Sequence, residues 1–236
     1  MSKPYDLHNK TSVLNFAKKL QGKTLRDVLN PVRVSQIENK LISAGNKGRF
    51  GQLVENHYFE YESNSDSSPD FPCGLELKIT PLKILKNGTL SPKERMVCNI
   101  INFMNIVDEN WESSTFLGKN VETLLVRYVD PLDASIGQLD YKFLDVRVHS
   151  LHDSGDIKQF EQDWNVIVNK IKSGNAHNIS ESDTKFLGAC TKGADSKSVR
   201  SQPFSNEMAM QRAFCFKTQY MRELLNRAPE IYDFLK

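Results

Sequence analysis

The sequence predicts a mixed α/β (α+β) protein, because it contains two kinds of apolar pattern. In several segments apolar residues recur at helical spacing, whereas in others they alternate with polar residues as in half-buried strands. The 236 residues are enough to bury one substantial core, which can be split into two lobes. A hydrophobic content of 39% and a mean hydropathy of −0.48, with no apolar run of membrane-spanning length, are typical of a soluble protein.

Helices dominate the first sixty residues. Residues 11–21 carry apolar side chains at helical spacing after a Thr or Ser cap, and Gly22 ends them. In the helix expected over residues 50–61, Phe50 and Val54 belong to the buried apolar stripe. Glu55 lies one residue from this stripe, so its side chain faces either solvent or a functional site. We expect helices over residues 11–21, 25–29, 32–43 and 50–61.

The stretch from Pro69 to Pro81 is the most informative part of the chain. From Gly74 onward apolar and polar residues alternate, which predicts a half-buried strand. The polar face of that strand carries Glu76 and Lys78. Asp70 precedes the strand in a turn flanked by prolines, from which its carboxylate can lie beside the polar face.

Two carboxylates and one ammonium group in this arrangement suit metal-assisted hydrolysis of phosphodiesters. Carboxylate oxygens bind hard divalent cations such as Mg²⁺, and a lysine can stabilise an attacking hydroxide. An ordinary solvated strand would show the same three residues. From these residues alone both interpretations stay open.

The remaining elements are predicted from the same two periods. The Asn87–Gly88 pair indicates a hairpin turn between Pro81 and Pro92. The segment from Trp111 to Asn120 is expected to pack through its aromatic residues. Residues 156–172 form the longest helix, with a stripe of apolar and aromatic side chains that we interpret as core. We expect further strands over Met96–Phe103, Leu124–Val129 and Tyr141–Val148.

Charge and cysteine usage limit the possible partners and compartment. The net charge of +2 is too small to indicate a nucleic-acid partner by itself. The N-terminal residues lack the apolar core of an export signal, so we expect a cytoplasmic protein. The four cysteines contain no C-x-x-C pair and are interpreted as free thiols, not as a disulfide framework or a zinc site. They are Cys73, Cys98, Cys190 and Cys215.

Positive charge is concentrated near the C-terminus. Between Lys185 and Arg227 there are eight basic residues against three acidic ones, Asp195, Glu207 and Glu223, an excess of five. Basic residues among Ser, Thr, Gln and Asn suit contacts to phosphates and to base edges. A solvated positive face would have the same composition, so both interpretations stay open here too.

Several segments together resemble the MutH family, which comprises a mismatch-repair nickase and related type II restriction endonucleases that cut at GATC. The resemblance includes the stretch from Pro69 to Pro81 and covers most of the chain. It is closest to the restriction enzymes of the staphylococcal type. It is carried by Gly48–Phe59, Lys93–Asn102, Trp111–Phe116, Asp163–Trp164, Phe186–Asp195, Arg200–Pro203 and Arg212–Lys217.

The resemblance implies a restriction-endonuclease-like fold with a PD-(D/E)xK core. Such a fold has a mixed central sheet flanked by helices, and two lobes around a cleft for duplex DNA. It implies a catalytic lobe over about residues 1–150 and a DNA-recognition part over about 151–236. The staphylococcal-type enzymes are about twice as long and have a second, C-terminal domain, so this chain would be a catalytic N-terminal domain, natural or excised.

The resemblance also assigns the catalytic residues. Asp70, Glu76 and Lys78 match the family's active site, and Glu55 matches a helical glutamate that precedes it. Asp70, Glu76 and the carbonyl of Leu77 would bind Mg²⁺, for which Mn²⁺ would substitute. The products would carry 5′-phosphates.

DNA recognition is assigned in the same way. Thr191, Lys192 and Gly193 match a loop that reads GATC in the major groove, and Lys119 matches a lysine near the active site. Further candidate DNA-binding residues are Arg200, Arg212 and Lys217. A transient dimer on the DNA is a further expectation.

Two positions depart from the nickase. Cys190 replaces an arginine, and Cys215 replaces a tyrosine held responsible for sensing adenine methylation. Cys215 is too short to sense the methyl group in that way, which favours a restriction enzyme that cuts methylated and unmethylated GATC. A methylation-sensitive nickase and a non-catalytic GATC-binding domain are the alternatives.

Overall fold

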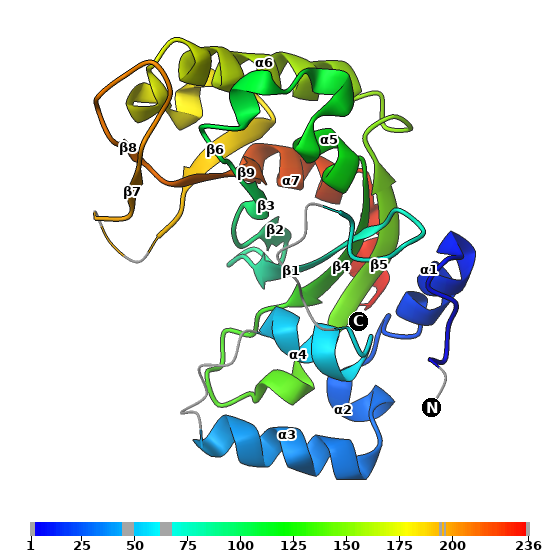
Figure 1. Ribbon diagram of the computed structural model, residues 1–236. Helices are drawn as coiled ribbons and strands as arrows, with labels where there is room; N and C mark the ends of the chain where they lie inside the picture. The colour runs from blue at the N-terminus through cyan, green and yellow to red at the C-terminus, as the bar shows by residue number, and fades with distance from the viewer. Residues whose placement is uncertain (1–2, 44–49, 62–67, 194, 196, 235–236) are drawn as a thin grey trace. The chain divides into compact units, whose positions relative to one another are not determined.

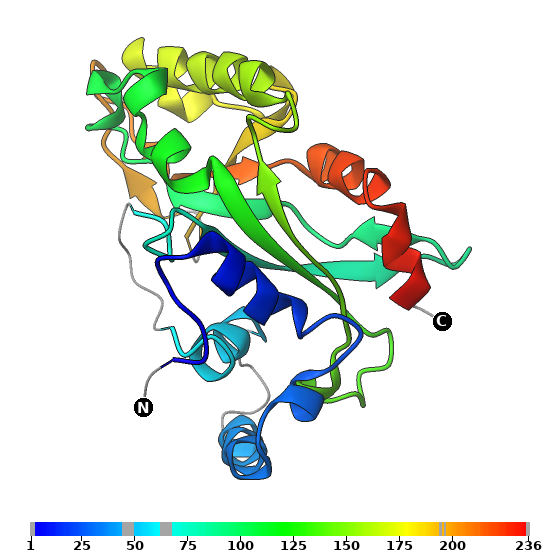
Figure 2. The same ribbon diagram turned by 90° about the vertical axis from the view of Figure 1, so that its right-hand side faces the viewer.

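The computed structural model (Figures 1 and 2) describes residues 3–43, 50–61, 68–193, 195 and 197–234, and it confirms the mixed α/β class. Residues 48, 49 and 194 of the segments that carry the family resemblance lie outside this part. The chain forms two compact units. Unit 1 comprises Met1–Glu94, Thr123–Val148 and Leu225–Lys236, and unit 2 comprises Arg95–Glu122 and His149–Leu224.

The helices of unit 1 begin and end close to the predicted positions. They are α1 (Lys10–Lys18), α2 (Leu25–Val28), α3 (Pro31–Ser43) and α4 (Phe50–His57). The cap of α1 is Asn9, whose side chain accepts a hydrogen bond from the main-chain N–H of Ser12 at 3.0 Å, and not the predicted Thr or Ser. The helix α4 stops four residues before its predicted end, since Glu60 has a left-handed backbone with φ of 52°.

Unit 1 is built on a four-stranded sheet with the order β2-β1-β4-β5. The strands are β1 (Glu76–Ile84), β2 (Leu90–Pro92), β4 (Glu122–Val129) and β5 (Phe143–Ser150). The strands β1 and β4 run parallel, and β2 runs antiparallel to β1. Main-chain bonds from Val129 to Lys142 and from Leu151 to Val121 show that β5 runs antiparallel to β4. The sheet is therefore mixed, as predicted.

The two faces of this sheet have different cores. One face packs Leu75 and Leu77 against the N-terminal helices, with a cluster of aromatic rings that includes Tyr5, Phe16 and Phe59. Figure 2 shows these helices, coloured blue to cyan, gathered on the same side of the sheet. Burying each such aromatic or leucine side chain stabilises the fold by about 1.5–3 kcal/mol. The other face carries Glu76 and Lys78 near its start, where the buried Leu125 is in register with Lys78, and an apolar cluster around Leu82 toward its far end.

Unit 2 contains a three-stranded sheet with the order β3-β9-β6 and a two-stranded hairpin, β7-β8. The strand β3 (Met96–Ile100) lies within the strand predicted over Met96–Phe103, and it pairs with β9. The helix α6 (Ile157–Lys172) matches the predicted longest helix, and Phe160, Trp164 and Ile171 on its apolar stripe are buried. The other elements are α5 (Thr115–Asn120), β6 (Leu187–Thr191), β7 (Val199–Arg200), β8 (Ala209–Met210), β9 (Arg212–Phe216) and α7 (Thr218–Asn226).

The compact units differ from the predicted division at about residue 150. Residues 95–122 belong with the C-terminal part because β3 pairs with β9, and residues 225–236 return to unit 1. This return packs Leu225 and Ile231 with Leu82. The role of each part in catalysis or recognition stays a prediction. Among the described helices, none combines the length and the hydropathy required to cross a membrane.

Candidate active site

A tight turn brings Asp70 back to the start of β1. The N–H of Phe71 donates to the carbonyl of Leu75 at 3.0 Å, and the N–H of Gly74 donates to the carbonyl of Phe71 at 2.8 Å. Gly74 has φ of 90°, a conformation that favours glycine. The turn therefore places Asp70 beside the first residues of the strand, as the sequence predicted.

Asp70, Glu76 and Lys78 lie together in the structure. The main-chain N–H of Leu77 donates to Oδ2 of Asp70 at 2.9 Å, and the N–H of Asp70 is 3.3 Å from Oε2 of Glu76. The Nζ atom of Lys78 is 2.7 Å from Oε1 of Glu76. The side chain of Glu76 is 2% exposed and that of Lys78 is 18% exposed, so this ion pair is largely screened from water.

Glu55 interacts electrostatically with this cluster from α4. Burial raises the pKa of Glu55, the negative charge of Asp70 raises it further, and Lys78 acts to lower it. Three carboxylates therefore share the neighbourhood of one ammonium group. This excess of negative charge favours a cation.

The oxygen atoms of the cluster are of the type that binds hard divalent cations. Because the N–H and C=O groups of one strand residue point to the same edge, the Leu77 carbonyl lies on the edge where its N–H meets Asp70. On that side no described strand pairs with β1 between Glu76 and Thr80, since β2 pairs only with Leu82–Ile84. Two carboxylates and this carbonyl provide the oxygen ligands that Mg²⁺ prefers. Within the described ranges no three His, Cys, Asp or Glu side chains form a metal-binding group, so the carbonyl is essential to the fit.

Comparison with known proteins shows which proteins the chain resembles. The family model described as "DNA mismatch repair enzyme MutH" matches residues 59–163, which include Asp70, Glu76 and Lys78. The chain is 36% identical over 222 residues to "Type II restriction enzyme Sau3AI" of Staphylococcus aureus. Over residues 59–163 the chain therefore has a MutH-like domain. The aligned region is 92% of this chain and 42% of the staphylococcal enzyme, so the chain spans less than half of that relative.

A repair protein of the same family is more distant. The chain is 27% identical over 190 residues to the "DNA mismatch repair protein MutH" of Shewanella woodyi, and the alignment covers 79% of each protein. The identity to the restriction enzyme is therefore higher and extends over more of this chain. The family match at 59–163 does not reach Glu55 or the predicted DNA-reading residues beyond 190.

The residues predicted to read the DNA sequence lie in unit 2, at the ends of β6 and β9 and in the turn after β6. Thr191 ends β6 opposite Arg212 on β9, and Lys192 donates its main-chain N–H to the carbonyl of Gln211 at 2.7 Å. Gly193 has φ of 132°, and a Cβ atom there would lie 2.1 Å from Cβ of Ser198. Gly193 is therefore required by a close approach of two chain segments.

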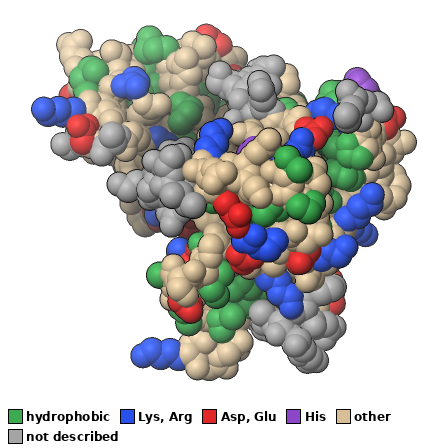
Figure 3. Space-filling view, turned by 90° about the horizontal axis from the view of Figure 1, so that it is seen from below, with side chains coloured by type: hydrophobic (Ala, Val, Ile, Leu, Met, Phe, Trp, Pro, Cys, Tyr) green, Lys and Arg blue, Asp and Glu red, His purple; other side chains and the backbone are tan. Residues whose placement is uncertain are grey.

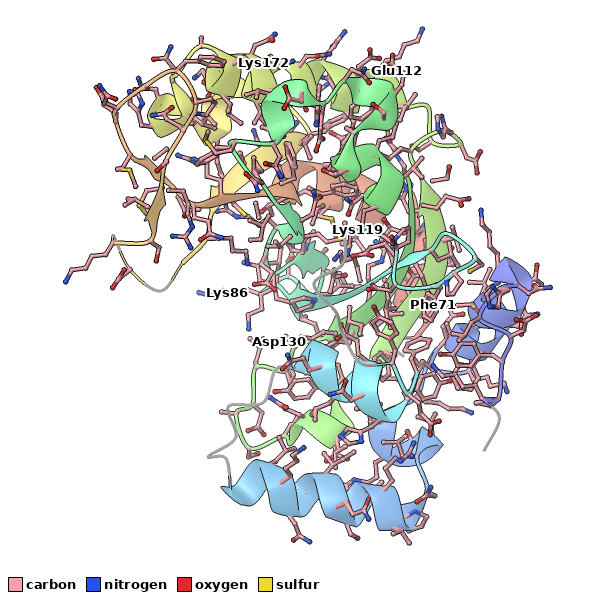
Figure 4. The ribbon with its side chains drawn as sticks, in the orientation of Figure 1. Phe71, Lys86, Glu112, Lys119, Asp130 and Lys172 are labelled. Carbon is pink, nitrogen blue, oxygen red and sulfur yellow. The ribbon has the colours of Figure 1, made fainter. Side chains whose placement is uncertain are left out.

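The other recognition candidates differ in accessibility. Arg200 is exposed in β7, whereas Arg212 is half-buried and donates to the carbonyl of Ala189 at 2.7 Å. Lys217 donates to the carbonyls of Glu181 and Thr184 at 2.5 and 2.6 Å, which gives its ammonium group a structural role. Lys119 is 8% exposed on α5 (Figure 4). Figure 3 shows positive and negative side chains interspersed on the face drawn, in keeping with the small net charge.

The structure reveals an ion pair that sequence reasoning missed. Arg127 on β4 and Asp145 on β5 are 1% and 2% exposed, with NH2 of Arg127 2.6 Å from Oδ2 of Asp145. Arg127 pairs in register with Thr80, two residues along β1 from Lys78. Although burial acts to raise the pKa of Asp145, hydrogen bonds from Arg147 and the charge of Arg127 lower it. In the sequence, the alternation of polar and apolar residues along 143–147 was the only indication of this ion pair. It does not show which strand lies next to these residues.

Proposed function

We propose that this chain is an Mg²⁺-dependent endonuclease that hydrolyses phosphodiester bonds of double-stranded DNA at 5′-GATC-3′. The observation that carries the proposal is the cluster of Asp70, Glu76 and Lys78 around the start of β1. The match to the MutH family and the identity to a type II restriction enzyme support the reaction class. Mn²⁺ would replace Mg²⁺, since the ligands are all oxygens.

In this proposal the chain's own residues divide the work. Asp70, Glu76 and the Leu77 carbonyl hold the cation, which supplies Lewis-acid activation of the scissile phosphate and of water. Lys78 orients the attacking water and stabilises the negative charge that develops on the phosphate oxygens. Glu55 supports the site electrostatically from α4 and offsets part of the charge of Lys78. The products carry 5′-phosphates.

We further propose that cleavage does not depend on adenine methylation. The Cys215 side chain is fully buried in β9, packed with Cys190 and Ala213, so its thiol does not reach DNA from this position. A methylation-sensitive nickase remains the second candidate, favoured by the alignment over most of a mismatch-repair protein. Because GATC is palindromic, cutting both strands would be achieved by two chains that meet transiently on the DNA.

Plasmid digestion tests the function. The chain is incubated with fully methylated and unmethylated plasmids, each with Mg²⁺ and with EDTA, and the ends are sequenced. Mg²⁺-dependent double-strand cuts at GATC on both plasmids are expected. Nicks confined to unmethylated strands would instead assign a repair-type nickase, and GATC binding without any cleavage would assign a binding domain.

A further inference from the structure

The hairpin between β7 and β8 presents an aromatic ring to solvent. The side chain of Phe204 is 78% exposed, and its backbone has φ of 59°, in the left-handed region. Both features are unfavourable: a bulky residue rarely adopts this backbone, and an exposed phenylalanine forgoes burial. Such outliers persist where the surrounding structure imposes them, and they concentrate at functional sites.

The surroundings of Phe204 hold it in this conformation. Gln202, which is 5% exposed, accepts a hydrogen bond from the N–H of Ala176 at 2.7 Å and donates to the carbonyl of Glu207 at 2.8 Å. These bonds fix the hairpin on both sides of Phe204. Gly174 packs directly beneath it, since a Cβ atom there would lie 2.8 Å from the Phe204 carbonyl oxygen. The ring is thus presented by a well-anchored hairpin.

The same hairpin is joined to the predicted DNA-reading turn. The carbonyl of Gln211 accepts the N–H of Lys192, and the N–H of Gln211 donates to the carbonyl of Ser198 at 2.9 Å. Ser198 leads into β7, whose exposed Arg200 pairs in register with Ala209 on β8. Two basic side chains, Lys192 and Arg200, therefore belong to the small structure that presents Phe204. The one acidic side chain of the hairpin, Glu207, lies 3.1 Å from Nε2 of His177. Apolar exposure beside positive charge fits a partner with anionic groups and flat apolar faces.

We propose that Phe204 makes apolar contact with the bases of duplex DNA bound to this unit, as a wedge at a base step or a stacking surface. Lys192 and Arg200 would contact phosphates or base edges at the same time. This inference rests on the proposed function and adds a specific contact residue to it. A second copy of the chain is a less suitable partner, because it would bring the same basic side chains together.

Three substitutions separate the role of the ring from that of the strained backbone. F204A removes the ring, F204G removes the ring and relieves the left-handed strain, and F204W keeps an aromatic surface. Affinity for a GATC duplex is measured by fluorescence anisotropy with Ca²⁺ in place of Mg²⁺, and stability by thermal unfolding. L132A is the control, because Leu132 is 84% exposed in unit 1.

We expect F204A and F204G to weaken binding about tenfold, as loss of one base–aromatic contact does. F204G should unfold at a higher temperature than F204A while binding equally weakly, and F204W should restore most of the affinity. L132A should change neither property. This combination would show that the ring serves binding at the expense of stability.

Two results would overturn the inference. If the unaltered chain binds GATC and both F204A and F204G bind equally well, Phe204 has no role in DNA contact, and the proposed function still stands. If sedimentation shows that the unaltered chain forms a dimer that F204A disperses at unchanged DNA affinity, the ring contacts another copy. Absence of GATC binding by the unaltered chain would instead contradict the proposed function itself.

Discussion

The main-chain N–H of Leu77 donates a hydrogen bond to Oδ2 of Asp70 across 2.9 Å. This bond fastens a carboxylate from the preceding turn to the edge of β1, next to Glu76. The spacing of the two carboxylates is therefore set by main-chain geometry, and changes of side-chain charge can be made without moving the strand. The predictions for the active site depend on this relationship.

Replacing Asp70 by Asn should strongly reduce cleavage while preserving the fold. The amide oxygen can still accept the Leu77 N–H, but the negative charge that we propose binds the cation is lost. We expect cleavage to fall by at least about a hundredfold, in the range seen on removal of one strong electrostatic contribution. Initial rates on a GATC plasmid measure this. D153N, at an exposed aspartate outside the cluster, is the control and should cut normally.

Replacing Lys78 by Met should reduce both activity and stability. The change leaves Glu76, 2% exposed, without its partner ammonium at 2.7 Å. We expect the free energy of unfolding to fall by about 2 kcal/mol, less than for a fully buried pair because Lys78 is partly exposed. The double variant E76Q/K78M should recover part of this loss, which urea unfolding of all variants would measure.

K83M is the matched control for Lys78, since Lys83 is exposed on the same strand. It should leave stability and cleavage nearly unchanged. A double variant that is destabilised by the full sum of the two single changes would show that Glu76 and Lys78 are not coupled.

Glu55 should make the stability of the chain depend on pH. Burial, and then the charge of Asp70, raise its pKa above the ordinary value of 4.5. The folded state therefore binds this proton more tightly than the unfolded state, and the resulting stability is present below pH 4.5 and lost as pH rises through the raised pKa. E55Q should thus be more stable than the unaltered chain at pH 7, with a difference that shrinks toward pH 4. Equal stabilities at both pH values would contradict this.

Divalent cations should stabilise the chain through the carboxylate cluster. A cation that binds only the folded state increases the free energy of unfolding, by about 2.7 kcal/mol when its concentration is a hundred times its dissociation constant. The unfolding temperature rises as a result. We expect Mg²⁺ or Ca²⁺ to raise the unfolding temperature, EDTA to reverse the shift, and E76Q to abolish it. An equal shift in E76Q would place the cation elsewhere.

Replacing Gly193 by Ala should disturb the predicted recognition turn. The added Cβ would lie 2.1 Å from Cβ of Ser198, and φ of 132° is unfavourable for alanine. The backbone strain alone costs about 1–3 kcal/mol. Anisotropy titrations should therefore show weaker GATC binding by G193A. Adding S198G to G193A should restore the affinity only in part, because it removes the overlap with the Ser198 side chain and leaves the backbone strain. Full affinity of G193A for GATC would show that this turn does not take part in recognition.

The strand that carries the proposed active site was predictable from sequence because its signals are local. The alternation after Gly74 fixes which face carries Glu76 and Lys78, and the short turn fixes where Asp70 lies. The sheet of unit 2 was not predictable in this way. The strands β6 and β9 are buried along almost their whole length, so they are short apolar runs without alternation.

Long-range pairing and surface exposure were the other limits. Nothing in the sequence links Arg127 to Asp145, which meet only because β4 and β5 are neighbours. A phenylalanine is usually a core residue, so the sequence gives no reason to expect Phe204 at the surface. Its exposure depends on the contacts of Gln202 and Gly174, which only the structure shows.

The role of Glu76 in catalysis is tested by single-turnover cleavage of a GATC duplex by the unaltered chain and by E76Q. Binding of the duplex is measured in parallel in Ca²⁺. We expect rapid Mg²⁺-dependent cutting by the unaltered chain and no detectable cutting by E76Q, while E76Q retains most of its affinity for the duplex. Cleavage by E76Q at the unaltered rate would contradict the assignment of the cluster around β1 as the active site.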